Sequence, residues 1–135
     1  MAFLSQTAFG QENARLKQLK TGSIKEAIAE IRNLSASKDG NLLCEGLEHK
    51  ELDVQISVMS KLKGSPDKNL VPKILDYLER NNFVQEGSEI ATVHVQLMQI
   101  AIAYIEAATG RSMGIKNIDN LKEVSAAITS ARKAK

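Results

Sequence analysis

Several residue types that mark common functional classes are scarce in this sequence. Tryptophan is absent and aromatic residues make up 4% of the 135 positions, so the chain offers no stacking platform for single-stranded nucleic acid. A single cysteine, Cys44, cannot form an internal disulfide, which is compatible with a reducing compartment. We therefore expect a cytoplasmic protein, and nucleic acid is disfavoured as its partner.

Charge of one sign is not in excess either. The chain carries 18 Lys and Arg against 16 Asp and Glu, and the two signs are mixed along it. Such a balance does not point to nucleic acid or to an anionic membrane surface. A hydrophobic content of 43% with 25% charged residues is typical of a folded globular chain. At this length we expect one domain, which can bury roughly two-thirds of its unfolded surface.

Long, purely apolar runs are also missing. The first residues, MAFLSQTAFG, have no basic region and no long apolar stretch, so we do not predict a signal peptide. The most apolar segment is Ile90–Ala108, which is interrupted by His94, Gln96, Gln99 and Glu106. It is long enough to span a membrane but too polar, so we expect no membrane association.

The motifs of several enzyme classes do not occur. There is no P-loop, dinucleotide-binding fingerprint, H-E-x-x-H or G-x-S-x-G, and the loop TGRSMG is too sparse to cradle a phosphate. His94 has no cysteine, histidine or carboxylate at ligand spacing, so we interpret it as a core histidine. His49 follows Cys44 by five residues, on the opposite side of a short helix, which does not suit a metal or nucleophile pair. We predict no enzyme activity and no catalytic, cofactor-binding or metal site.

What the sequence does contain is helical periodicity. Apolar residues recur at three- and four-residue steps, which indicates one buried face of an α-helix. Ser23 and Glu26 form an S-x-x-E capping box before the first clear run, and Ser65 with Pro66 has the pattern of a later helix start. The expected helices are a short one through Leu16 and Leu19 that ends near Gly22, then Ile24–Leu34, Leu42–Leu47, Leu52–Leu62, a helix from Pro66 through Leu78, Ser88–Ala108 and Leu121–Ala131.

Three of these helices have features that bear on their packing. Ser88–Ala108 has its polar residues along one narrow strip and is otherwise apolar, which predicts a central, mostly buried helix ended by Gly110. Gly46 weakens the short helix in which it lies. Pro72 falls in the first turn or two of its helix, where it predicts a local bend.

The chain also repeats itself. A shift of 28 residues, the step from Ile24 to Leu52, superposes two segments, and the turns SKDGNLL and SPDKNLV align together with the helices. Helical periodicity alone would not align the turn residues, so we predict two copies of a helix–turn–helix unit. The matched pairs are Ile28/Ile56, Ile31/Met59, Leu34/Leu62, Ser37/Ser65, Asp39/Asp67, Asn41/Asn69, Leu42/Leu70, Leu43/Val71 and Leu47/Leu75.

The second copy resembles a HEAT repeat. DVQISVMSKL is similar to the first HEAT helix through Asp53, Val54 and Leu62, with Gln55 where Arg is usual, and NLVPKILDYL resembles the second. AIAYIEAATGRSMG is similar to an ending common in bacterial HEAT-like chains. The residues that match in the second helix and in this ending are Leu70, Pro72, Ile74, Leu75, Leu78, Thr109, Gly110 and Gly114.

The resemblance covers residues 22–114 and implies an all-α fold. That fold would be a short, right-handed α-solenoid of stacked antiparallel helix pairs, with about six or seven helices in all. The predicted organisation of this single helical-repeat domain (1–135) is an N-terminal cap (1–21), repeat 1 (22–50), repeat 2 (51–83), a diverged repeat 3 (84–114) and a C-terminal capping helix (115–135).

A binding role follows from the resemblance. In HEAT arrays the second helices line the concave face, so the resemblance places a partner site on the polar side of the helix that follows Asp67. We expect a non-catalytic protein–protein interaction module, a scaffold or adaptor that binds another protein. Two alternatives stay open, a nucleic-acid-binding helical-repeat protein and an accessory or lyase-like protein acting on a bound small ligand, and homo-oligomerisation is open as well. The candidate partner-binding residues are Asn69, Lys73, Asp76, Tyr77 and Arg80.

Overall fold

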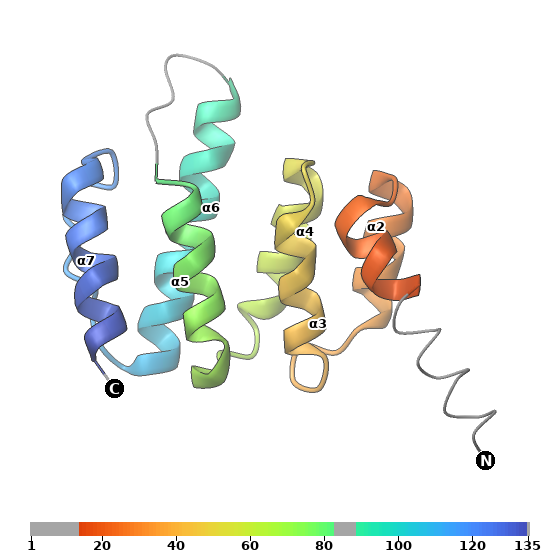
Figure 1. Cartoon of the computed structure of the whole chain (residues 1–135), viewed down its shortest axis with the longest axis horizontal. Coiled ribbons are helices and arrows are strands. Elements are labelled where there is room, and N and C mark those ends of the chain that lie inside the picture. The colour runs from red at the N-terminus through yellow and green to blue at the C-terminus, as the bar shows by residue number, and fades with distance from the viewer. Residues whose placement is uncertain (1–13, 83–88, 135) are drawn as a thin grey trace. The chain divides into compact units, whose positions relative to one another are not determined.

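The fold is helical throughout the part of the chain that can be described. A computed structural model (Figure 1) describes residues 14–82 and 89–134, with the side chains of residues 89–92 excepted. Within these ranges there are helices and no strands, which confirms the predicted all-α class. The chain divides into two compact units, Met1–Lys61 and Leu62–Lys135, and each is described by itself. The stacking of all helix pairs into one α-solenoid stays a prediction.

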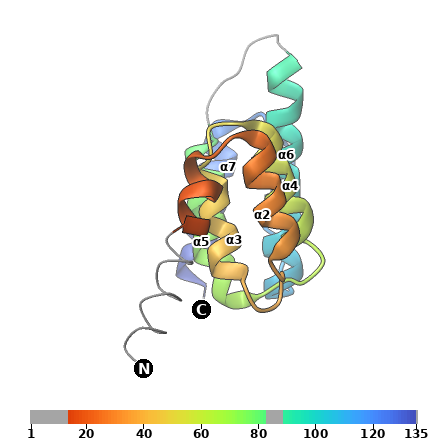
Figure 2. The ribbon, with the colours of Figure 1, turned by 90° about the vertical axis from the view of Figure 1, so that its right-hand side faces the viewer.

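The first unit contains the expected helices. Residues 14–21 are helical, and α2 (Ile24–Asn33), α3 (Gly40–Glu45) and α4 (Leu52–Leu62) follow. At Gly46 the helix tightens into the 3₁₀ segment η1 (Gly46–Glu48), where the sequence predicts a weakness. The axes of α2, α3 and α4 are roughly aligned in both views (Figure 1, Figure 2).

The start of α2 has the predicted cap in a modified form. The Ser23 hydroxyl accepts a hydrogen bond from the Glu26 backbone N–H at 3.1 Å, which satisfies a free donor of the first turn. Glu26 does not reach the Ser23 backbone, because its carboxylate accepts from the Ser23 hydroxyl at 3.0 Å. At the other end of α2, the Lys61 ammonium donates to the carbonyls of Ile31 and Arg32, at 2.8 and 3.0 Å. Both ends of this helix are therefore closed by side chains.

His49 is a buried connector in the first unit. Its ring is 2% exposed, and its Nδ1 accepts a hydrogen bond from the Glu51 backbone N–H at 3.0 Å. Nε2 therefore carries the proton and donates to the Gly22 carbonyl at 2.6 Å. The Gln55 amide donates to the His49 carbonyl at 2.7 Å. These bonds join the end of the first helix to the start of α4, so His49 is a structural residue. The apolar core around it consists of Leu19, Ala27, Ile31, Leu34, Leu43, Leu47, Val54, Val58 and Met59.

The second unit is built around α5. It contains η2 (Lys68–Leu70), α5 (Val71–Arg80), α6 (Glu89–Thr109) and α7 (Leu121–Lys133), and α5 packs against both α6 and α7 (Figure 1). The predicted residue Ser88 lies outside the described residues. The core is formed by Leu70, Ile74, Leu75, Tyr77, Leu78, Leu97, Met98, Ala101, Tyr104, Ile105, Val124 and Ile128.

Two details of the second unit differ from the sequence prediction. The helical segment before α5 begins after Asp67, not at Ser65 and Pro66, because the Asp67 carboxylate accepts from the Asn69 N–H at 2.9 Å. Pro72 is in the first turn of α5, as predicted, and a 3₁₀ turn precedes it. The prediction that α6 is mostly buried is too strong, since its buried residues lie on one face and the flanking Ile100 and Ile102 are half-buried.

The repeat is visible in the element boundaries. α2 begins at Ile24 and α4 at Leu52, which are equivalent positions in the 28-residue shift. The equivalent residues Asp39 and Asp67 each precede the next helical segment as its N-terminal cap residue. In several equivalent pairs both residues are buried, each in its own copy, namely Ala27/Gln55, Ile31/Met59, Leu34/Leu62, Leu43/Val71 and Leu47/Leu75. In the two copies, the helix starts, the N-terminal cap residues and the buried positions therefore correspond to one another.

Candidate binding face on helix α5

Helix α5 has one buried and one exposed side. Its apolar residues recur at three- and four-residue steps and face the core of the second unit. The opposite side carries Pro72, Lys73, Asp76, Glu79 and Arg80, all of them exposed. A rigid helix of this kind can present polar groups to a partner without reordering its backbone.

Four of the five predicted binding residues are exposed. Lys73, Asp76 and Arg80 lie on the exposed side of α5, and Asn69 lies just before it in η2; we call these four residues the α5 strip. Tyr77 does not belong to it, because its side chain is only 1% exposed. The prediction that Tyr77 lies on the partner face is therefore wrong. Tyr77 follows Ile74 by three positions, so it borders the buried stripe and the packing of the second unit covers its ring.

Although it is buried, Tyr77 contacts Arg80, a member of the α5 strip. The Arg80 guanidinium carbon lies 5.8 Å from the centre of the Tyr77 ring, within the range of a cation–π contact. Burial raises the pKa of the Tyr77 phenol, and the positive charge of Arg80 opposes this rise to a smaller extent. The neutral phenol ring of Tyr77 therefore lies against the exposed guanidinium of Arg80.

The acidic residues of the exposed side are engaged by α7. The Arg132 guanidinium donates to the Asp76 carboxylate at 2.9 Å and also to the carboxylate of Glu79. These hydrogen bonds, the one to Asp76 most and then the one to Glu79, raise the pKa of Arg132. Because all three side chains are well exposed, the contacts are worth only about 0–1 kcal/mol each. No local sequence signal could pair Arg132 with Asp76, because 56 residues separate them along the chain.

The C-terminal end of α5 is held by several hydrogen bonds. The Asn81 side-chain amide donates to the Tyr77 carbonyl at 2.7 Å, and His94 Nε2 donates to the Asn81 carbonyl at 2.5 Å. His94 is 4% exposed, which confirms the prediction of a core histidine. The Asn82 amide reaches α7 through the Leu121 carbonyl at 3.1 Å. Arg80 thus sits on a well-anchored helix end.

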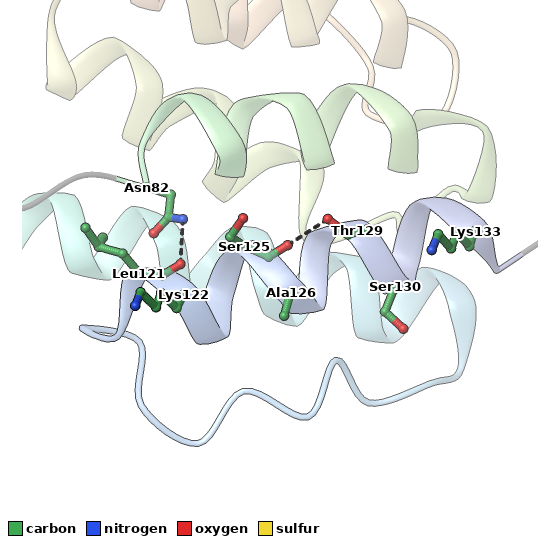
Figure 3. Close-up of a pocket in the computed structure, with 8 residues that line it drawn as sticks. All are labelled: Asn82, Leu121, Lys122, Ser125, Ala126, Thr129, Ser130 and Lys133. Carbon is green, nitrogen blue, oxygen red and sulfur yellow. Dashed lines mark hydrogen bonds between the residues drawn. The ribbon is translucent and has the colours of Figure 1, made fainter.

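A shallow, open groove runs along α7 (Figure 3). Short side chains dominate its lining, and Thr129 donates to the Ser125 carbonyl at 3.1 Å within the helix. The side-chain oxygen of Asn82 is buried at one end of the groove without a hydrogen-bond partner. A groove of this depth and composition does not exclude water from a reacting group, so it does not suit catalysis. Its lining residues are Asn82, Leu121, Lys122, Ser125, Ala126, Thr129, Ser130 and Lys133.

Several backbone amides of the loop between α6 and α7 are already engaged by side chains of the protein. The Met113 N–H donates to the Glu106 carboxylate at 2.8 Å, and the N–H groups of Lys116 and Asn117 donate to Glu123. The described residues hold no cluster of three or more His, Cys, Asp or Glu side chains suited to a metal. None of the helices in the described ranges has the length and apolarity that crossing a membrane requires.

Comparisons with protein-family models, with curated protein sequences and with solved structures find no match for this chain. The HEAT resemblance therefore stays a prediction that rests on its own residues.

Proposed function

We propose that this protein is a non-catalytic protein–protein interaction module, a scaffold or adaptor that binds another protein through the α5 strip. The observation that carries the proposal is the repeated helix–turn–helix pattern, whose second copy turns one side of α5 outward. Both members of several equivalent pairs are buried, as in repeats that use the same core positions in each copy. Stacked repeats of this kind commonly form extended binding surfaces. The HEAT resemblance points to the same side of the second helix.

The chemistry of the strip suits recognition. It contains lysine, asparagine, aspartate and arginine on a rigid helix, and arginine is enriched among the residues that dominate binding energies. We also propose a cytoplasmic location, because a chain with one cysteine gains no internal disulfide from an oxidising compartment.

The test uses three baits in a native lysate, read by quantitative mass spectrometry. The first is the unchanged protein and the second carries Lys73→Glu and Arg80→Glu. The third is a matched control, Lys122→Glu with Lys133→Glu, which makes the same charge change on the exposed side of α7. Circular dichroism first verifies that all three are equally helical.

The expected result is a protein captured by the first and third baits and lost by the second. Equal capture by all three baits would show that the partner does not bind through the α5 strip. Loss in both variants would indicate a general charge effect. Capture of nucleic acid in place of protein would favour the alternative of a nucleic-acid-binding repeat protein.

A further inference from the structure

We infer that His49 is a pH-sensitive switch, whose neutral ring holds the end of the first helix (residues 14–21) to the start of α4 and whose protonated ring releases it. This inference goes beyond the proposed function and does not depend on it. The switch lies in the unit Met1–Lys61, whereas the α5 strip lies in Leu62–Lys135.

The first step concerns the two partners of the ring. The Gly22 carbonyl accepts a hydrogen bond from Nε2 at 2.6 Å, and the Glu51 backbone N–H donates one to Nδ1 at 3.0 Å. A carbonyl oxygen only accepts hydrogen bonds and a backbone N–H only donates them, so neither partner can change its role. Of the two neutral tautomers and the cation, only the tautomer with its proton on Nε2 satisfies both partners.

The second step concerns the effect of a second proton. It binds at Nδ1, the ring nitrogen that carries no hydrogen, and there it points at the Glu51 N–H. The hydrogen bond between them is lost, and two donors face each other. Because the His49 side chain is only 2% exposed, water does not reach the site to replace the lost acceptor. The protonated ring therefore does not fit the contact that the neutral ring makes.

The third step concerns the charges around the ring. The charged side chains on the elements that His49 joins are of both signs and are exposed or half-buried. Within the described residues, none of these side chains makes an ion pair or a hydrogen bond with the ring. Lys20 pairs instead with Glu45 and Glu48, at 3.3 and 2.8 Å. No described carboxylate thus contacts the ring to stabilise a positive charge there. The charged residues are Lys17, Lys20, Lys25, Glu26, Glu45, Glu48, Lys50, Glu51 and Asp53.

The fourth step concerns what separates when the ring moves. The Gly22 N–H donates to the Gln18 carbonyl at 3.0 Å, so Gly22 belongs to the end of the first helix. The Glu51 carbonyl accepts from the Gln55 N–H at 3.3 Å, and the Gln55 amide donates to the His49 carbonyl, so both belong to the start of α4. The imidazole ring is rigid, and a shift of Nδ1 away from Glu51 also shifts Nε2 away from Gly22. Protonation therefore frees the first helix from α4.

The first measurement is the protonation state of the His49 ring in the unchanged chain. NMR correlations between the carbon-bound ring hydrogens and the two ring nitrogens distinguish the two neutral tautomers and the cation. At pH 7.5 we expect the proton on Nε2 alone. A ring with its proton on Nδ1, or on both nitrogens, at this pH would overturn the inference.

The second measurement is native-state hydrogen exchange of residues 14–21 between pH 7.5 and pH 5.5, expressed as protection relative to an unstructured chain at the same pH. In the open state the ring titrates like an ordinary histidine, with a pKa of about 6.5, while the closed contact takes up no proton. The opening equilibrium then rises about tenfold over this range, so we expect protection to fall about tenfold. Constant protection would overturn the inference.

His49→Gln separates His49 from the other titrating groups. Glutamine can still donate to the Gly22 carbonyl but carries no charge at any of these pH values, and His94, the other histidine of the sequence, is unchanged. We expect this variant to lose the tenfold fall in protection, and the same fall in both proteins would overturn the inference. If the variant does not fold, the unchanged chain decides, because its protection must fall over the same pH range in which the His49 ring signals show protonation.

Discussion

The phenol of Tyr77 is the most strongly perturbed side chain on α5. Its ring lies in the core of the second unit, with Arg80 above it, and burial disfavours the charged phenolate. Folded chains therefore hold the phenolic proton more tightly than unfolded chains, in which tyrosine titrates with a pKa of about 10.

We expect this difference to make stability depend on pH in the alkaline range. As pH rises above about 10, unfolded chains release the proton and folded chains keep it, so the free energy of unfolding falls. The slope approaches about 1.4 kcal/mol per pH unit, and Tyr77→Phe removes it. Urea denaturation followed by circular dichroism at several alkaline pH values measures both proteins. An identical alkaline loss of stability in the two would show that the phenol is not sheltered.

Helical periodicity predicts the burial of some residues of α5 correctly and of others wrongly. The periodicity of α5 correctly separates Ile74 and Leu78 from Lys73 and Asp76, because these lie at the centres of opposite sides. It fails for Tyr77, which lies on the border between them. Whether a border residue is covered depends on the neighbouring helices, which the local sequence does not specify.

At the scale of elements, η1 approaches α4 closely at Gly46. A Cβ atom added at Gly46 would lie 2.7 Å from the Cγ2 atom of Val58. Valine is β-branched and stiff at χ1, so this methyl group cannot move away easily. The glycine that weakens the helix is therefore also the residue that lets two elements meet.

Gly46→Ala is expected to destabilise the protein by about 1–3 kcal/mol through overpacking. Propensity alone predicts the opposite sign, because alanine is usually the better helix residue by roughly 0.5–1 kcal/mol. A double-mutant cycle with Val58→Ala, measured by urea denaturation, tests the cause. Gly46→Ala should cost less in the Val58→Ala background, and an unchanged cost would show that this methyl group is not the obstacle.

The repeat was the most predictable feature at this scale. A shift of 28 residues correctly anticipated the equivalent starts of α2 and α4, because capping residues and apolar spacing are local signals. The start of the helical segment before α5 was predicted less well. Ser65 and Pro66 have a suitable pattern, but the Asp67 carboxylate accepts from Asn69 and the Asp67 N–H donates to Tyr104. The second of these bonds spans 37 residues, beyond any local signal.

At the scale of the whole molecule, the chain divides into two compact units, Met1–Lys61 and Leu62–Lys135. Repeats that share a continuous core unfold together when the interfaces between them are strong. The predicted single solenoid requires such an interface between the units, and two independently folding units do not.

If the solenoid prediction is correct, the most protected amides of both units exchange with the same free energy of opening. Native-state hydrogen exchange at increasing urea, resolved by NMR, measures this for each helix. We expect the slowest amides of α2 and α5 to converge on one value. Two separate values would show that Met1–Lys61 and Leu62–Lys135 unfold independently, and the solenoid would then be wrong.

The sequence by itself determined the helical class, the helix starts with local caps and the repeat. Each of these depends on residues within a few positions of one another, where backbone geometry makes spacing equivalent to direction. Only the tertiary structure decided that Tyr77 is buried, that His49 joins Gly22 to Glu51, and that Arg132 holds Asp76. These outcomes depend on which helix faces meet across long stretches of chain, and the apolar pattern of one helix does not encode its neighbour.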